Sequence, residues 1–256
     1  MSTKTPAALV ELLVAARREG CAVSAAGWET VLQNAEQAYA VQDAVAAALG
    51  WFSDGPPRHW KCGGPSRQAT LTNAPLAPAG VRASAADFSD LTLNDAGIEA
   101  EIALRLGEDV TREVARRLTP DDAASLVDAM TVSIEIVDSR WQEGAQAPAL
   151  LRLADAQSHG ALALGAWVPY AARDWSAQRC EARVGAQEPV VRTGTLSVGE
   201  PTWLLPFWLR HATRHGDTVA ASTVVTTGTW VGVLPARRGE VVSVEFPGIG
   251  HTTLEL

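Results

Sequence analysis

The segment from Gly97 to Leu106 constrains the fold more than any other part of this chain. Its apolar residues occupy every second position, at Ile98, Ala100, Ile102, Leu104 and Leu106. A period of two is typical of a β-strand that packs one face against a core. The opposite face then carries Glu99, Glu101, Ala103 and Arg105. We therefore predict a half-buried strand with two carboxylates on the face that points away from the core.

Glu99 and Glu101 are two residues apart, so on a strand they point the same way, roughly 6–7 Å apart along the backbone. Their long side chains can converge on one ion. Hard divalent cations such as Mg²⁺ take oxygen ligands and usually keep some waters that a substrate can replace. The alternative is a solvated face on which Arg105 supplies the counter-charge.

A further acidic residue, Glu135, interrupts the otherwise β-branched run from Thr131 to Arg140. Glutamate is a poor strand former, and a carboxylate within an apolar strand is costly unless it is paired or binds a metal. The alternative is an edge strand with Glu135 facing water. Three glutamates on two strands would instead form a facial oxygen site with open coordination positions.

Composition narrows the class of protein. The 256 residues are 47% apolar and 20% charged, as in an ordinary globular protein. A net charge of −8 without any basic run argues against a nucleic-acid partner. No apolar run reaches the ~18 residues that a membrane helix needs, and the N-terminal sequence has no signal-like apolar block. The cysteines fit free thiols, so we expect a soluble, cytoplasmic protein with no membrane partner.

Capping signals and hydrophobic periodicity predict the elements along the chain. Thr5-Pro6 is typical of a helix start and Gly20 of a helix stop, and Thr119-Pro120 before two aspartates predicts another start. The predicted helices span residues 5–20, 34–49, 119–130 and 201–215. The predicted strands include one that ends at Lys61 or Cys62, and those at 131–140, 223–227, 241–246 and 251–256. We expect a connecting loop over 74–94, and strands and hairpins over 167–198.

Lys61 stands out because the chain otherwise uses arginine, its other lysine being Lys4 near the N-terminus. It precedes Gly63-Gly64, and a glycine pair lets backbone approach a ligand closely. A lysine at the lip of such a turn can reach an anion. The alternative is a surface lysine beside a turn.

These segments resemble a known family. Gly97–Leu104 is similar to the Glu-x-Glu metal strand of the fumarylacetoacetate hydrolase superfamily, and Ile134–Arg140 to the strand that carries its third acidic ligand. Further similarity favours the 2-keto-4-pentenoate hydratase branch, which includes 2-oxo-3-hexenedioate decarboxylases. It lies at Ala38–Gln42, in the lysine loop Lys61–Ser66 and in the substrate-carboxylate pocket Ala154–Ser158. The segments Thr226–Thr229, Gly239–Glu240 and Gly248–Gly250 resemble the closing strands of the superfamily as a whole.

The resemblance implies a mixed α/β fold, with a helical cap and lysine loop over residues 1–80 on a mixed β-sandwich roll over 81–256. It also implies a homo-oligomer, a small 2-keto acid substrate, and one Mg²⁺ or Mn²⁺ held by Glu99, Glu101 and Glu135. In this interpretation Lys61 stabilises the negative charge of the enolate or transfers a proton, and Asp90 is the candidate acid. The substrate-binding residues would be Ser66, Gln157, Ser158 and Thr227.

Hydration of a 2-hydroxydienoate is the leading reaction that the resemblance implies. The alternatives are decarboxylation of a 2-keto diacid, C–C bond hydrolysis, and a catalytically reduced metal-binding partner subunit. The sequence departs from the branch in three places. The lysine loop reads Cys62-Gly63-Gly64-Pro65 instead of the usual apolar-Gly-apolar-Thr. The Pro-Asp-Phe/Tyr-Gly segment is missing, with only Asp87–Asp90 in its interval, and neither His59 nor His159 has an evident acidic partner.

Overall fold

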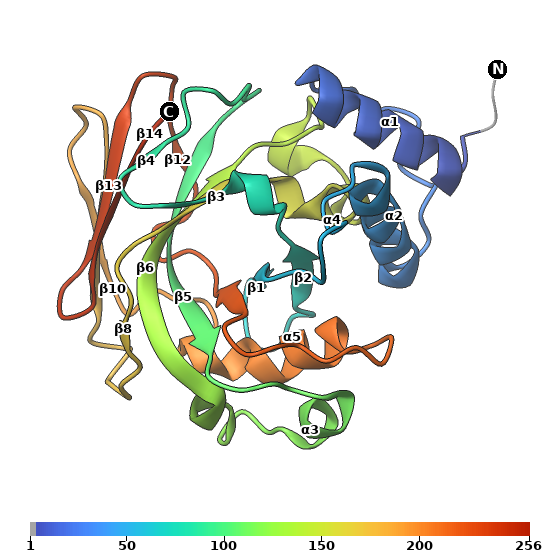
Figure 1. Cartoon of the computed structure of the whole chain (residues 1–256). Coiled ribbons are helices and arrows are strands. Elements are labelled where there is room, and N and C mark those ends of the chain that lie inside the picture. Colours follow the sequence, from blue (N-terminus) through green and yellow to red (C-terminus); the bar gives the residue numbers. More distant parts are fainter. Residues whose placement is uncertain (1–3) are drawn as a thin grey trace.

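Two long strands, β5 (Gly97–Leu106) and β6 (Val127–Val137), run side by side through the middle of the computed structural model, which describes residues 4–256 (Figure 1). They pair antiparallel, with Glu99 opposite Glu135. The alternate apolar residues of β5 are buried, as the period of two predicts, but Glu101 and Ala103 on the opposite face are buried too, so the strand is not half-buried as predicted. The predicted strand at 97–106 is confirmed, and the one at 131–140 begins earlier and ends earlier than predicted.

β5 and β6 belong to a large mixed sheet with the strand order β2-β1-β11-β5-β6-β7-β3. The short strand β12 pairs with β5, and β8 pairs with β6. Strand β1 runs parallel to β11, which is antiparallel to β5. The remaining strands are β1 (His59–Gly63), β2 (Thr72–Pro75), β3 (Val81–Ala83), β7 (His159–Leu164), β8 (Val168–Pro169), β11 (Val224–Thr226) and β12 (Leu234–Pro235).

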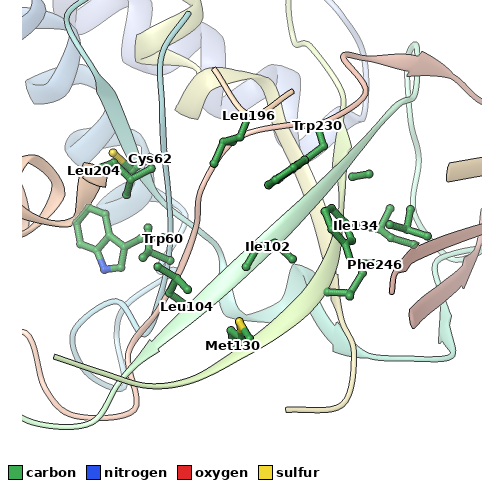
Figure 2. Packing of buried hydrophobic residues seen from close by; sticks show 14 of the residues in the cluster. Trp60, Cys62, Ile102, Leu104, Met130, Ile134, Leu196, Leu204, Trp230 and Phe246 are labelled. Atoms are coloured by element: carbon green, nitrogen blue, oxygen red, sulfur yellow. The ribbon is translucent and has the colours of Figure 1, made fainter. Parts of the chain in front are cut away.

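A smaller sheet with the order β10-β9-β13-β14-β4 lies on the other side of β5 and β6 from the N-terminal helices (Figure 1). The main core fills the space between the sheets, where Ile102 and Ile134 lie near Trp230 and Phe246 (Figure 2). The Trp230 and Phe246 rings meet edge to face at 5.3 Å. The strands are β4 (Ala86–Asp87), β9 (Arg179–Val184), β10 (Val190–Thr193), β13 (Val241–Phe246) and β14 (Gly250–Glu255).

The helices α1 (Pro6–Glu19), α2 (Ala35–Ala48) and α4 (Ala149–Ala154) pack together around a second apolar cluster that includes Trp141. Thr5 caps α1 by accepting the Ala8 amide at 3.2 Å, and Asn34 caps α2. Both predicted N-terminal helices are therefore confirmed. Two other helices, α3 (Arg112–Arg117) and α5 (Leu205–Ala212), lie together at the opposite end of the molecule (Figure 1).

The helix predicted over 119–130 is wrong. Residues Ala123–Leu126 form one 3₁₀ turn, and β6 begins at Val127 because Met130 pairs with Leu104 of β5. Local capping signals there are overridden by the sheet. The loop predicted over 74–94 is wrong in part, since the short strands β3 and β4 lie within it. The helix predicted over 201–215 is shorter, with a 3₁₀ turn at Pro201–Leu204 ahead of α5.

The mixed α/β class with N-terminal helices on curled mixed sheets is as predicted. Strands β1 and β2, which precede residue 80, form part of the large sheet. Within residues 4–256, no helix combines the length and apolar character that crossing a bilayer requires.

Candidate metal centre

Three glutamates converge on the face of β5 and β6 that is turned away from the main core. The strand register sets Glu99 opposite Glu135, and Glu101 two residues further along β5. Each carboxylate offers an oxygen, and these atoms all lie within 4.8 Å of one another. Glu101 and Glu135 are buried, whereas Glu99 is partly exposed. Such an oxygen cluster can hold one divalent cation.

The turn after β11 holds the Glu101 carboxylate in place through a backbone hydrogen bond. The Gly228 amide donates to its Oε2 at 3.0 Å, and the Thr227 hydroxyl donates to the Ile102 carbonyl at 2.8 Å. Gly228 has φ 94°, a conformation that residues with a side chain rarely adopt. The Thr227 hydroxyl, predicted to bind substrate, is therefore engaged with the backbone of β5.

Glu135 receives two donors on one oxygen and none on the other. Lys61 Nζ and His159 Nδ1 lie 2.6 and 2.9 Å from its Oε1. Its Oε2 is buried, and no group among residues 4–256 hydrogen-bonds to it. An orphaned buried carboxylate oxygen is rare because it forfeits its hydration without a replacement. The oxygen-only donor set and this free atom together fit a bound hard cation.

Burial raises the pKa of Glu99 to about 7 and that of Glu101 to about 8, and the negative charge of Glu135 adds to both effects. Burial also acts to raise the pKa of Glu135, but Lys61 and His159 outweigh it and lower that pKa. For Lys61, burial favours the neutral amine, but Glu135 and the other two glutamates outweigh it and raise its pKa. Lys61 thus offsets the charge of Glu135, whereas Glu99 and Glu101 hold their protons more tightly than usual, and a bound cation would favour their charged forms.

Lys61 reaches this centre because successive side chains of β1 point to opposite faces of the sheet. Trp60 and Cys62 point into the main core, and Lys61 between them points to the opposite face. The parallel pairing of β1 with β11 brings it into the sheet that carries the glutamates. The alternative of a surface lysine is wrong, since its side chain is 12% exposed.

His159 is a site residue that the sequence reasoning missed. No acidic partner for His159 is evident in the sequence, but β7 pairs with β6 and brings its ring to Glu135. The two residues are 24 positions apart, and a bulge shifts the register between Ile136 and Val137. No local sequence signal marks such a contact.

The segment Ala156–Ser158 lines the centre in an unusual conformation. Its residues have φ values of 51°, 54° and 60°, all left-handed and none of them glycine. Such backbone costs energy and persists only where its surroundings fix it. Here Lys61 Nζ lies 3.4 Å from the Gln157 carbonyl oxygen, the Asp138 amide donates to the Ser158 carbonyl at 2.7 Å, and the Gln157 side-chain amide contacts the Thr72 hydroxyl.

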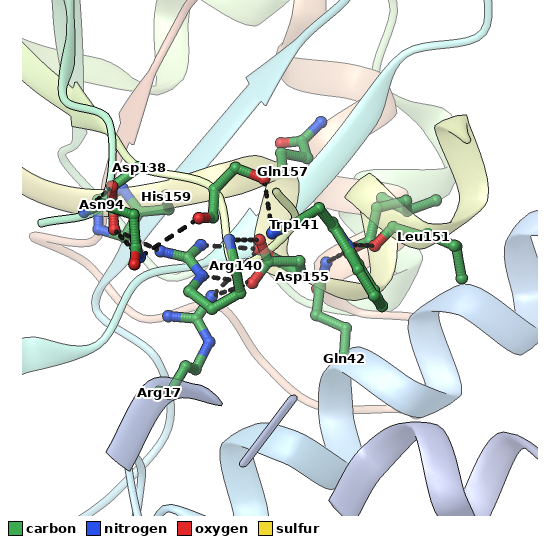
Figure 3. Close-up of polar contacts among 12 residues, drawn as sticks. Arg17, Gln42, Asn94, Asp138, Arg140, Trp141, Leu151, Asp155, Gln157 and His159 are labelled. Carbon is green, nitrogen blue, oxygen red and sulfur yellow. Dashed lines mark hydrogen bonds and ion pairs between the residues drawn. The ribbon is translucent and has the colours of Figure 1, made fainter. Parts of the chain in front are cut away.

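Asp155 anchors that segment to the N-terminal helices. Figure 3 shows Arg17 from α1 and Arg140 both directed at its buried carboxylate. Arg17 Nη2 lies 2.9 Å from Asp155 Oδ1 and Arg140 Nε 2.7 Å, and the Arg140 amide donates to Oδ2 at 3.0 Å. Arg17 and Asp155 are 138 residues apart in sequence.

Two cavities, of about 450 and 390 Å³, open on the glutamates. Both are lined by Lys61, Glu99, Arg152 and Gln157, so they are two compartments of one site. Ser158 lines the first, and Glu101 with the Gly63-Gly64 turn lines the second. A separate cavity of about 540 Å³ lies between α2 and the segment after α5, away from the glutamates.

Comparison with known proteins identifies the family. The family model for the C-terminal region of fumarylacetoacetate (FAA) hydrolase matches residues 68–255, well over half the chain. The chain belongs to the fumarylacetoacetate hydrolase family.

Curated relatives and solved structures agree with this membership. The proteins named 2-keto-4-pentenoate hydratase 2 and 2-keto-4-pentenoate hydratase 1 from Dechloromonas aromatica (strain RCB) are 28% and 27% identical, over 97% and 99% of this chain and 96% of each relative. The 4-oxalocrotonate decarboxylase from Pseudomonas putida G7, solved with calcium and acetate and with magnesium and adipate, shares the fold. It has a TM-score of 0.80 and 18% identity, over 99% of this chain and 98% of its own.

Three predicted site residues of this family member line neither compartment: Asp90, Ser66 and the buried Thr227. Asp90, the candidate acid, has a 63% exposed side chain, forms a two-pronged ion pair with Arg82, and lines neither compartment. Ser66 accepts the Gln68 amide and also lines neither, although its neighbour Pro65 does. The short interval before Asn94 forms edge strands, which hold Asp90 away from the glutamates.

We predict that Asp155→Asn destabilises the fold by about 3–5 kcal/mol, because Arg17 loses its ion-pair partner and buried Arg140 keeps only the Asp138 carboxylate, at 3.7 Å. Urea unfolding of the metal-free protein measures the change. Asp43→Asn is the matched control, since its ion pair with Arg214 is solvent-exposed and should contribute little. Equal stability losses in the two variants would contradict the anchoring role of Asp155.

Proposed function

We propose that this protein is a divalent-metal-dependent lyase acting on small 2-keto acids or their 2-hydroxydienoate tautomers. The observation that carries the proposal is the cluster of Glu99, Glu101 and Glu135 beside Lys61 in a cavity. The hydratase names of the two relatives and the metal-bound structures of the decarboxylase support the same chemistry.

Glu99, Glu101 and Glu135 would hold one Mg²⁺ or Mn²⁺, with the free Oε2 of Glu135 as one donor. When bound, such an ion supplies Lewis-acid stabilisation of the negative charge that develops on the keto oxygen.

The chain's own residues would orient the substrate and handle protons. Lys61 Nζ lies between Glu135 and the Gln157 carbonyl, where its ammonium offsets anionic charge and can pass a proton to a substrate carbon or oxygen. Gln157 and Ser158 line the cavity from the left-handed segment and would hold the substrate carboxylate. The partial burial of this wall limits the access of bulk water.

Hydration of a 2-hydroxydienoate to a 4-hydroxy-2-keto acid is the first candidate reaction, because both relatives that span the chain are named hydratases. Decarboxylation of a 2-keto diacid is the second, and one observation favours it. Water addition needs a base near the far end of the diene, and Asp90 lies away from the cavity. Decarboxylation releases CO₂ and needs chiefly an electron sink and one proton.

We predict that Glu101→Gln weakens Mn²⁺ binding without unfolding the metal-free protein, since it removes a charged ligand and keeps the shape. At a metal concentration of about 100 times its dissociation constant, the wild type should gain about 2.7 kcal/mol of stability. The variant should lose most of that gain in calorimetry and thermal melts. The control is Glu113→Gln, an exposed residue of α3. Unaltered Mn²⁺ affinity in Gln variants of all three glutamates would exclude the site.

We predict that Lys61→Met and Lys61→Arg each lower kcat by about 10²–10⁴-fold while Mn²⁺ still binds, because no metal ligand is removed. Arginine keeps the charge but rarely gives up a proton, and its planar fork needs more room. Lys4→Met is the control, since Lys4 is the other lysine of the chain. Near wild-type turnover by Lys61→Met would remove Lys61 from the chemistry.

We predict Mn²⁺-dependent turnover of 2-hydroxypenta-2,4-dienoate or of 2-oxo-3-hexenedioate, abolished by a chelator. Dienol absorbance reports hydration, and evolved CO₂ reports decarboxylation. Asp90→Asn should leave kcat unchanged on either substrate, because Asp90 lies off the cavity. Stoichiometric Mn²⁺ binding without turnover of any 2-keto acid would contradict the enzyme and support the partner-subunit alternative.

A further inference from the structure

Arg152 is the one residue of α4 that lines both compartments of the site. Its flanking residues Leu151 and Leu153 are buried, so the helix itself turns the arginine toward the cavity. Its Nε donates to the Ala147 carbonyl at 3.0 Å, and that bond fixes the plane of the guanidinium group. Among residues 4–256, no carboxylate lies within ion-pair distance of Arg152.

The other charged side chains that line the cavity either have partners within the protein, belong to the glutamate cluster, or are exposed to solvent. Lys61 pairs with Glu135. Asp138 accepts the backbone amides of Asn94 and Asp95 and lies 3.7 Å from Arg140. Asp95 lines the first compartment but is exposed. Among the described residues that line the cavity, Arg152 is thus the cationic side chain without an anionic partner. Its two terminal nitrogens remain available to donate hydrogen bonds to a ligand.

Glu99 and Arg152 line the same two compartments, so a ligand held at the glutamates has Arg152 in the wall of its cavity. A planar guanidinium matches a carboxylate through paired hydrogen bonds, and partial burial strengthens them. A monocarboxylic 2-keto acid would leave this cation unpaired. A dicarboxylic one would bring an anion to it.

We propose that Arg152 forms a subsite for a second carboxylate, so that this protein selects 2-keto diacids over 2-keto monoacids of the same length. This inference rests on the proposed function, because the first carboxylate must be held at the metal centre. It names the substrate class of that centre, whichever lyase reaction follows.

The test compares ligands that differ only at the far end. Calorimetry with the Mn²⁺-loaded protein measures the affinity of 2-oxoadipate against 2-oxohexanoate, and of 2-oxoglutarate against 2-oxopentanoate. The wild type should bind the diacid of at least one pair roughly tenfold or more tightly. Arg152→Met should abolish that preference, and Arg152→Lys should keep part of it. Arg116→Met, on exposed α3, is the control and should keep it whole.

Oxalate, which has no far end, separates the two proposals. Its Mn²⁺-dependent affinity should be the same in the wild type and in Arg152→Met. If oxalate binds but neither pair shows a diacid preference, or if the preference survives in Arg152→Met, the subsite is wrong and the metal centre stands. If oxalate fails to bind the Mn²⁺-loaded protein, the proposed function fails and the subsite fails with it.

Discussion

Crowding three carboxylates on one face of two paired strands is the constraint on which the rest of this structure depends. The antiparallel register of β5 and β6 sets Glu99 opposite Glu135, and Glu101 is buried beside them. Bringing like charges out of water raises the pKa values of Glu99 and Glu101 well above their usual range. A fold tolerates such a cluster when something else in the site supplies positive charge.

The chain supplies part of that charge from distant segments. Lys61 comes from β1 and His159 from β7, and both bind the same oxygen of Glu135. Lys61 also holds the left-handed segment at Gln157, which Asp155 ties to Arg17 of α1. The helical layer is therefore joined to the metal centre by buried ion pairs. The cation that completes the balance would also be the one that activates a 2-keto acid.

How much of this could be predicted from sequence depends on the range of each interaction. The bounds of β5 follow from a period of two, and the caps of α1 and α2 from Thr5 and Asn34. The glutamate cluster follows because two residues of one strand share a face and Glu135 disrupts a strand pattern. These signals are local, so they can be recognised in the sequence without knowledge of the fold.

The remaining features depend on contacts that no local pattern encodes. His159 meets Glu135 only after β6 and β7 pair across a bulge, and Arg17 meets Asp155 across 138 residues. The capping signal at Thr119-Pro120 suggested a helix that the pairing of Met130 with Leu104 prevents. Asp90 was chosen by its place in the chain, yet Arg82 holds it on the outside of the molecule.

The most direct test of the central claim is a crystal structure of the protein with Mn²⁺ and oxalate, a mimic of the enolate form of a 2-keto acid, phased on the anomalous signal of manganese. We predict one strong anomalous peak bound by Glu99, Glu101 and Glu135, with oxalate completing its coordination and Lys61 beside it. An anomalous peak at other residues, or no peak at these three under saturating Mn²⁺, would contradict the account.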